Sequence, residues 1–555
     1  MTKTISILLL ALIVSSCRPE AKNPTETDID TDADTDTDAD TDTDTDSSCP
    51  GTWGTTYYTR PDGGDASQCT GQTNAAYPGS GTMEDCAFSH PFIALPPGGK
   101  PLIDGGDRLI IGTGEYAMGY GAPGADNCEL AWSYDCQMAT IPSGSTMEQP
   151  TCIVGEGWDS GCSAAPELYG TGRPWSILDL SNSDFIRVEC LEITDHSDCV
   201  EYHSGGLACN RSSAPYGDWA SNGIFATDSS NVTLKNLDIH GLANTGIQAG
   251  RLTDWTIINV RIAANGWAGW DGDVDGQDGN SGTTSFSGVT IEYNGCSETW
   301  PGEDPTGCWA QTAGGYGDGL GTGTTGGDWL FEDSAILHNT SDGLDLLYHT
   351  GGGTITINRV RAEGNAGNQL KVAGEARIAN AVVVGNCGYF EGKSFTHHVD
   401  PCRALGSSLV TFFNTATEVS VVNSTIFGQG DVLLTAETCP AQATLIARNN
   451  IYVGSTDFHD SSDQTAFFWT DCSSLTFDHD YGVVHDAKDG SHSCPVGSND
   501  LCEDPFLSGW ENTALSPGND NGLDVGELGL IPDDDILGNP RPVGDGVDRG
   551  AYELQ

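Results

Sequence analysis

Three aspartates and one lysine lie in three neighbouring segments that recur at nearly constant spacing in the middle of the chain. Asp318 stands in the stretch GDGLG, Asp342 and Asp345 stand in SDGLDLL, and Lys371 follows in GNQLKV. Carboxylate oxygens are the ligands that Ca²⁺ prefers, and a lysine that has lost its proton can act as a general base. These four side chains could hold a calcium ion beside a base if the fold brings them together.

The segments that carry these residues repeat with a period of about two dozen residues, which is typical of solenoids. In one series, Leu320, Leu344 and Leu370 are spaced by 24 and 26 residues. A second series holds short strand pairs that bend at a polar residue, expected at Asn236, Asn259, Asp333, Asn358, Asn423 and Asn449. Strand pairs too short to bury a face alone predict an all-β fold, a right-handed parallel β-helix (solenoid).

The alternation of side chains along a strand assigns these residues to faces. Leu344 and Leu346 inside the coil place Asp345 outside, and the same reasoning places Lys371 outside on the next rung. Asp345 and Lys371 then lie side by side, because adjacent parallel strands are about 4.8 Å apart. A second stack is expected at the turn before this strand, formed by Asp318 and Asp342.

The order IHGLANTGIQAG, IEYNGC, GDGLG, HNTSDGLDLL and GNQLKVAG resembles the pectate lyases of polysaccharide lyase family 9. The resemblance extends from Ile239 to Gly374 and implies a parallel β-helix enzyme that uses calcium and a lysine base. It implies calcium ligands at Asp318, Asp342 and Asp345 and a catalytic lysine at Lys371. The family pattern has two consecutive aspartates where this chain has Ser341 and Asp342, so one expected carboxylate is missing.

Such a site suits the β-elimination of a uronic-acid glycan. The base removes the proton at C5, next to a carboxylate, and the oxygen at C4 then leaves. Ca²⁺ can bind that carboxylate and stabilise the developing negative charge. A nearby divalent cation also disfavours the ammonium form of Lys371. We therefore expect a calcium-dependent polysaccharide lyase that acts on an acidic polysaccharide such as pectate.

Two other functions are compatible with the same residues. Asp-Gly pairs are ordinary turn chemistry, and an outward lysine beside an aspartate is ordinarily a solvated ion pair. The solenoid could then be a non-catalytic surface protein for adhesion or glycan binding. Alternatively, the three aspartates could serve as the paired carboxylates of a glycoside hydrolase of the polygalacturonase type.

A weaker calcium motif lies in DGDVDG, which has the alternating carboxylates and the following glycine of a calcium loop. Its carboxylates are Asp271, Asp273 and Asp275. The twelfth position is Gly282 and not the glutamate of an EF-hand, so the stretch is either a structural calcium site or a polar loop. Four tryptophans nearby could offer flat faces to sugar rings or simply pack: Trp267, Trp270, Trp300 and Trp309.

The charge of the chain limits its partners. There are 79 acidic and 22 basic residues, for a net charge of −57. Nucleic acid is excluded as a partner, because its phosphates would be repelled. An anionic glycan would also be repelled unless cations intervene, which favours the calcium interpretation.

The first residues, MTKTISILLLALIVSSC, have the build of a secretory signal and resemble a bacterial lipoprotein signal. Cys17 would then be the lipidated first residue of the mature chain. We expect an exported protein, lipid-anchored at the bacterial outer membrane or cell surface, that contacts the membrane only through this anchor. The Thr/Asp-rich segment that follows is too polar to fold and predicts a disordered spacer.

Apart from Cys17, the cysteines form an even number, which predicts disulfides in an exported protein. They crowd between Cys49 and Cys209 and between Cys387 and Cys502, so we expect stapled terminal regions and loop insertions. The chain is expected to act as a monomer. The predicted organisation is a signal peptide (1–16), a spacer (17–48), a Cys-rich cap with the first coils (49–170), the β-helix core (171–460), and C-terminal coils with a cap (461–555).

Overall fold

The computed structural model describes residues 49, 54–203, 205–274, 279–309, 316–386, 388–398, 407–430, 432–455, 465–487, 493–530 and 533–555. Several predictions concern residues outside this set: the signal segment, Cys17, the spacer and Asp275. In the described part of the chain, no helix is long and apolar enough to cross a membrane.

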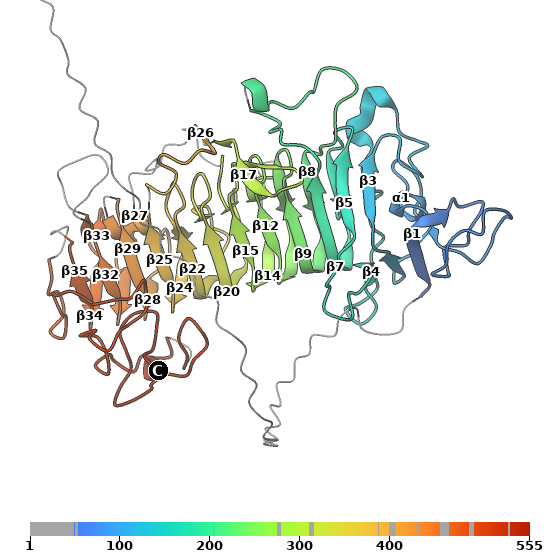
Figure 1. Cartoon of the computed structure of the whole chain (residues 1–555). Helices are drawn as coiled ribbons and strands as arrows, with labels where there is room; N and C mark the ends of the chain where they lie inside the picture. The colour runs from blue at the N-terminus through green and yellow to red at the C-terminus, as the bar shows by residue number, and fades with distance from the viewer. Residues whose placement is uncertain are drawn as a thin grey trace, which may run out of the picture. The chain divides into compact units, whose positions relative to one another are not determined.

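Nearly all the regular structure belongs to two parallel sheets, whose strands stack in chain order (Figure 1). The ten-stranded sheet, called here the small sheet, contains β6 (Ser176–Asp179), β8 (Asn222–Thr227), β10 (Thr245–Gly250), β13 (Ala268–Asp271), β19 (Leu320–Gly321), β21 (Leu344–Leu346), β23 (Leu370–Ala373), β27 (Ser407–Phe412), β30 (Val432–Glu437) and β33 (Ala466–Thr470).

The large sheet has 21 strands. Its N-terminal strands are β1 (Thr56–Gly64), β2 (Arg108–Ile111), β3 (Glu115–Gly119), β4 (Thr151–Gly155), β5 (Glu167–Thr171), β7 (Asp184–Asp195), β9 (Ser230–His240), β11 (Thr253–Ile258), β12 (Arg261–Ala263), β14 (Ser281–Ser287) and β15 (Thr290–Glu292). The remaining strands are β20 (Asp328–Leu337), β22 (Thr354–Glu363), β24 (Glu375–Ala379), β25 (Val382–Gly385), β28 (Glu418–Val422), β29 (Thr425–Gly428), β31 (Thr444–Arg448), β32 (Ile451–Val453), β34 (Thr476–Asp480) and β35 (Val483–His485).

Helices are few and short: α1 (Pro91–Ala94) and the 3₁₀ turns η1 (Leu130–Asp135), η2 (Gly205–Leu207) and η3 (Gly526–Leu528). Two small strand pairs lie in the insertions. They are the antiparallel pair β16 (Ser297–Thr299) with β17 (Asp304–Thr306), and the parallel pair β18 (Cys308–Trp309) with β26 (Thr396–His398). The predicted fold, a right-handed parallel β-helix with disulfides and loop insertions, is confirmed.

The bends of the large sheet occur at residues in the left-handed region, where a short polar side chain is favoured. The predicted bends at Asn236, Asn259, Asp333, Asn423 and Asn449 have φ values between 46° and 56°. The bend expected at Asn358 occurs one residue later, at Arg359. Arg359 makes this bend while its guanidinium donates to Asp333 Oδ1 at 2.6 Å on the preceding rung, a contact that sequence spacing does not reveal.

The coil interior is filled by apolar side chains in register. On the small sheet, Ile247 pairs with Trp270, Trp270 with Leu320, Leu320 with Leu344, and Leu344 with Leu370. All five are fully buried. The long interval between Ile247 and Leu320 therefore holds a single rung of this sheet, at Trp270, and its other residues form the large-sheet strands and insertions.

One corner of the coil is closed by a ladder of buried amides. The Asn265 amide donates to Asn294 at 2.9 Å, Asn294 to Asn339 at 2.9 Å, and Asn339 to Asn365 at 2.8 Å. Asn365 in turn donates to Gln369 Oε1 at 2.8 Å. Because the asparagine amides bond from one rung to the next, this ladder fixes the register of the rungs from 265 to 365, and Gln369 satisfies the last amide within its own coil.

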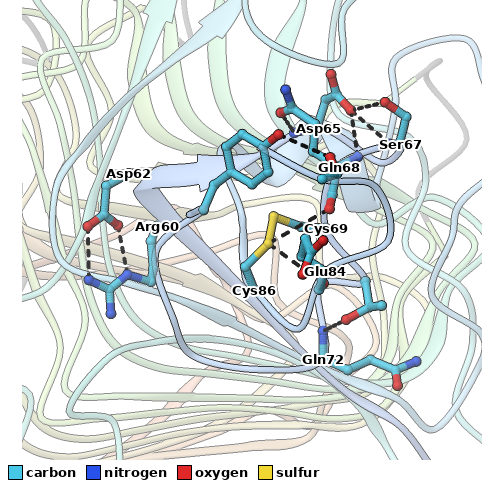
Figure 2. The surroundings of a disulfide bond; sticks show 12 residues. Arg60, Asp62, Asp65, Ser67, Gln68, Cys69, Gln72, Glu84 and Cys86 are labelled. Carbon is cyan, nitrogen blue, oxygen red and sulfur yellow. Dashed lines mark hydrogen bonds and ion pairs between the residues drawn. A yellow bond between two sulfur atoms is a disulfide. The ribbon is translucent and has the colours of Figure 1, made fainter. Parts of the chain in front are cut away.

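Disulfides join segments in the N-terminal part of the chain, in the insertions and in the C-terminal part. Figure 2 shows Cys69–Cys86, beside the turn in which Asp65 Oδ1 accepts from the backbone of Ser67 at 2.8 Å. Cys387 and Cys402 lie outside the described residues. The other disulfides are Cys49–Cys152, Cys128–Cys136, Cys162–Cys190, Cys199–Cys209, Cys296–Cys308, Cys439–Cys472 and Cys494–Cys502.

The C-terminal segment returns along the large sheet after β35. Asp534 pairs with Arg359 at 2.8 Å, and the backbone of Leu523 donates to Asn449 Oδ1 at 2.8 Å. The segment thus covers the bends of rungs far earlier in the chain.

Candidate active site

Three neighbouring strands of the small sheet, together with the turns before them, position the predicted site residues. Gly321 on β19 pairs with Asp345 on β21, which pairs with Lys371 on β23. Leu344 and Leu346 are fully buried, whereas the side chain of Asp345 is 18% exposed and that of Lys371 is 14% exposed. The predicted register and the predicted outward direction of both residues are confirmed.

Lys371 lies between two carboxylates. Its Nζ donates to Asp342 Oδ2 at 2.5 Å and to Asp345 Oδ2 at 2.8 Å. Asp345 is also held by the backbone of Leu347, which donates to Oδ1 at 3.0 Å. The lysine and the two aspartates therefore form one contact group on adjacent rungs.

The turns that precede these strands form a second stack. The backbone of Asp342 donates to Asp318 Oδ1 at 3.0 Å, and the backbone of Asn368 donates to Asp342 Oδ1 at 2.7 Å. The Asn368 side chain adds a contact to the same oxygen at 3.1 Å. The stack of Asp318 and Asp342 was expected, whereas Asn368 was missed. The sequence does indicate this role, because Asn368 occupies in GNQLKV the turn position that aspartate occupies in GDGLG and SDGLDLL.

Ser341 lies at the missing-carboxylate position of the sequence motif. It is fully buried, and its side chain is hydrogen-bonded to Asp318. The hydroxyl thus holds one of the carboxylates of the site without adding a further negative charge.

Burial and mutual repulsion dominate the electrostatics of the group. Burial, reinforced by Asp342 and Asp345, raises the pKa of Asp318 to about 7. Burial also raises the pKa of Asp345, against the opposing effect of Lys371. For Lys371, burial alone lowers the pKa, but Asp342 and Asp345 outweigh it, so the pKa lies above its usual value. In the absence of another cation, Lys371 is an ammonium that neutralises the aspartates.

A cleft of about 530 Å³ opens over these rungs. Asp271 and Asp273, predicted as a separate calcium loop, line the same cleft, and Asp271 Oδ1 accepts from the backbone of Asp273 at 2.9 Å. Gly321 separates the ladder positions of Asp271 and Asp345. The charged side chains that line the cleft are Asp271, Asp273, Asp318, Asp342, Asp345 and Lys371.

Gly321 keeps the space between the carboxylates open. A Cβ atom at this position would lie 3.0 Å from Asp318 Oδ2, which is tighter than van der Waals contact. The glycine therefore leaves room for an ion or a sugar substituent where any other residue would press on a buried carboxylate.

The four tryptophans do not share one role. Trp267 lines the cleft, but Trp270 is fully buried in the coil. Trp300 stacks on His196, and Trp309 packs against Tyr316. Of the two alternatives for Trp270, packing is the one observed, because its position on the strand points inward. Tyr348, which sequence reasoning missed, lines the cleft and is 54% exposed.

The chemistry of this donor set fits Ca²⁺. The cleft presents five carboxylates and no imidazole or thiolate among its described lining residues, and hard oxygen ligands are those that Ca²⁺ takes. The pKa of Asp318 is raised by burial and then by the neighbouring carboxylates Asp342 and Asp345, and a divalent cation would offset both effects.

No protein family model and no curated protein matches the chain. Among solved structures it is similar to the pectate lyase Pel9A, with 14% identity, 91% of this chain and 98% of that chain covered, and a TM-score of 0.37. It is similar to an alginate lyase from Paenibacillus sp. str. FPU-7, at 13% identity, 68% and 94% coverage and a TM-score of 0.34. It is also similar to the A-module of the Azotobacter vinelandii mannuronan C-5 epimerase AlgE4, at 11% identity, 72% and 91% coverage and a TM-score of 0.30.

Proposed function

We propose that the chain is a calcium-dependent polysaccharide lyase that cleaves an acidic, uronic-acid glycan such as pectate by β-elimination. The observation that carries this proposal is the position of Lys371 Nζ, 2.5 Å from Asp342 and 2.8 Å from Asp345, in a cleft lined by three further aspartates. A base candidate and a set of hard oxygen ligands thus share one surface of the coil.

Lys371 would remove the proton at C5 of the uronic acid. It can do so only as the free amine, since an ammonium has no lone pair to accept a proton. Asp342 and Asp345 favour the ammonium, so this pair must be weakened when the substrate binds. The same two contacts hold Nζ on the cleft side of β23, where the proton to be removed would lie.

Asp318, Asp342 and Asp345 would hold the calcium ion, and Asp271 and Asp273 could contribute from the adjoining rung. Ca²⁺ bound there would neutralise the substrate carboxylate and stabilise the negative charge that develops as the C5 proton leaves. The need for such an ion follows from the charge of the cleft, since Lys371 is the only basic residue among its described lining residues.

Two aromatic rings could orient the glycan. Tyr348 and Trp267 line the cleft with the aspartates, and aromatic faces pack against the apolar faces of sugar rings. The polar groups would then determine which sugar is accepted, and the rings would hold the chain along the rungs.

A glycoside hydrolase of the polygalacturonase type is the second candidate. The observation that favours it is Asp318, whose pKa is raised to about 7 beside other carboxylates. A protonated carboxyl next to an ionised one is the arrangement of a general acid and its partner in glycosidases.

The products distinguish these functions from each other and from non-catalytic glycan binding. The purified chain is incubated with polygalacturonate and with alginate, in Ca²⁺ and in chelator, and both ultraviolet absorbance and reducing ends are measured. A lyase produces unsaturated ends that absorb, in Ca²⁺ only. A glycosidase releases reducing ends without this absorbance. The absence of both products from every uronan would overturn the enzymatic proposals and leave the surface-protein function.

We also propose that the chain is exported and anchored through a lipid on Cys17. The disulfides of the described residues are compatible with an oxidising compartment. Growth of a bacterial host that expresses the chain with a labelled fatty acid should label the wild-type protein and not Cys17→Ser. Equal labelling of both would contradict the anchor.

A further inference from the structure

A second cluster of charged side chains lies on the large sheet, under the hairpin of β16 and β17. The hairpin lies between Cys296 and Cys308, which a disulfide joins at its base. Its Trp300 stacks on His196, with ring centroids 4.2 Å apart. The hairpin thus lies near the C-terminal ends of β7 and β9, where Glu192 and His240 are found.

Three side chains from three segments converge at this place. One ligand atom each of Glu192 on β7, His240 on β9 and Glu303 on the hairpin lies within 4.8 Å of the others. His240 is 2% exposed, and its Nε2 lies 3.3 Å from Glu192 Oε1. The distances are those of side chains that can share one ion.

An independent feature orients the imidazole. His240 Nδ1 lies 2.8 Å from Glu298 Oε1, which comes from the base of the same hairpin. Glu298 is 1% exposed, and its Oε2 has no hydrogen-bond partner among the described residues. A histidine that binds a metal usually donates its other ring nitrogen to a carboxylate. Glu298 is such a carboxylate, buried behind the ring, and it directs Nε2 toward Glu192 and Glu303.

The charge and the access of the site also suit a cation. Arg261 is the only arginine at this site among the described residues, and it contacts three acids: Asp238 at 3.0 Å, Glu292 at 3.0 Å and Glu303 at 3.4 Å. The contact with Glu303 uses Oε2, which leaves Oε1 for an ion. A cavity of about 380 Å³, lined by Glu192, Asp238 and Arg261, adjoins the site and could admit an ion and its water.

We propose that Glu192, His240 and Glu303 bind a divalent metal ion of the zinc class, with Glu298 positioning His240. An imidazole nitrogen with two carboxylates is a ligand set of Zn²⁺ and Co²⁺, whereas Ca²⁺ takes oxygen ligands. Three protein ligands leave a fourth position for water. The ion joins β7, β9 and the hairpin, so it fixes the hairpin on the large sheet. The site shares no residue with the lining of the cleft, so its metal affinity is measured independently of the lyase proposal.

The test is a titration of the full chain with Zn²⁺ by calorimetry, after removal of metals with a chelator and in excess Ca²⁺, which saturates the oxygen-only sites. The wild type is expected to bind one Zn²⁺ tightly. Glu303→Gln, at an exposed ligand that the fold does not need, should weaken binding at least about tenfold, and Glu298→Gln should weaken it by about 10- to 100-fold. Asp304→Asn, at the exposed neighbouring residue, is the matched control and should bind as the wild type does.

A spectroscopic readout identifies the ligand. Co²⁺ in place of Zn²⁺ should produce visible absorption bands that change in His240→Gln. The absence of a tight Zn²⁺ site in the wild type would overturn the proposal, as would a site that keeps its affinity in Glu303→Gln. If His240→Gln does not fold, Glu303→Gln and its control decide the outcome alone.

Discussion

Two groups of carboxylates lie on different sheets of the same coil, and each surrounds a different basic side chain. On the small sheet, Lys371 contacts Asp342 and Asp345. On the large sheet, His240 lies between Glu192 and Glu298. A lysine amine has one nitrogen and binds a metal poorly while it is protonated, whereas an imidazole can bind a metal with one nitrogen while the other stays hydrogen-bonded.

The electrostatic surroundings are alike, although the chemistry is not. Burial lowers the pKa of His240, but Glu192 and Glu298 outweigh it and raise the pKa to about 10. The same balance of burial against two carboxylates raises the pKa of Lys371. The comparison teaches that stacked rungs readily collect carboxylates on the coil surface, and that the basic group held between two of them, an amine or an imidazole, determines the chemistry available.

The contrast between the two groups would be lost if Lys371 were an ordinary ion-pair partner and not a catalytic base. We expect Lys371→Ala to lower the rate of unsaturated-end formation by about 1,000-fold, since general-base catalysis contributes roughly 10²- to 10⁴-fold. The rate is measured by ultraviolet absorbance on polygalacturonate in Ca²⁺. Lys393→Ala, at a lysine that lies over the Tyr389 ring, is the control and should retain the wild-type rate. Equal rates in Lys371→Ala and the wild type would contradict the assignment of the base.

Metal removal tests whether the two groups bind different metal ions. A chelator selective for Ca²⁺ should lower the lyase rate by about 100-fold or more, because the ion supplies several kcal/mol of charge stabilisation. Added Ca²⁺ should restore the rate, and Zn²⁺ should not. A rate that survives the Ca²⁺ chelator, or that Zn²⁺ restores, would contradict an oxygen-only calcium site on the small sheet.

The pH dependence of stability tests the buried charge of the small-sheet group. The pKa of Asp318 is raised to about 7, above an unfolded value of about 3.9. Between these values the folded state binds the proton more tightly, so this group makes the metal-free chain less stable as pH rises from about 4 to 7. Asp318→Asn cannot titrate, so its stability relative to the wild type should increase over this range.

The expected gain in relative stability is on the order of 2 kcal/mol between pH 5 and pH 8. It is measured by urea unfolding of both proteins in chelator. Asp304→Asn, at an exposed aspartate of the hairpin, should show no comparable trend. A difference between Asp318→Asn and the wild type that stays constant with pH would contradict the raised pKa.

The smallest expected effect concerns the residue that extends the turn stack. Asn368→Ala removes the side-chain contact of 3.1 Å to Asp342 Oδ1 and keeps the backbone contact of 2.7 Å. We expect a loss of about 1 kcal/mol in unfolding free energy, typical of one hydrogen bond, because the backbone of Asn368 still donates to the same oxygen. The lyase rate should fall by less than tenfold. If both quantities match the wild type, Asn368 does not hold Asp342 in position.

Much of the fold could be predicted because the repeat itself carries the information. Leu320, Leu344 and Leu370 recur at one coil length, and the alternation around them determines which residues face outward. The bend lies at Arg359 and not at Asn358, because the register of β20 with β22 places Arg359 beside the bend residue Asp333. Spacing alone cannot tell which of two adjacent polar residues adopts the left-handed conformation.

The site could be predicted in part, for the same reason. The contacts of Lys371 with Asp345 follow from register, which the repeat contains. The presence of Asp271 in the same cleft does not, because a long stretch of sequence with an insertion separates Asp271 from Gly321, although the two residues pair directly in the sheet. The convergence of Glu303 on His240 depends on how a hairpin folds over the coil, and nothing in the repeat describes that insertion.

The asparagine ladder has a consequence for how this chain can change. Asn265, Asn294, Asn339 and Asn365 bond from coil to coil and so hold the rungs in register. With the register held, an insertion of one residue inside β21 would exchange the faces of Asp345 and Leu344. Extra residues at the corners, as in the hairpin between Cys296 and Cys308, leave the strands untouched. Descendants of this sequence can therefore gain or lose whole loops while the surface carboxylates and the lysine keep their positions.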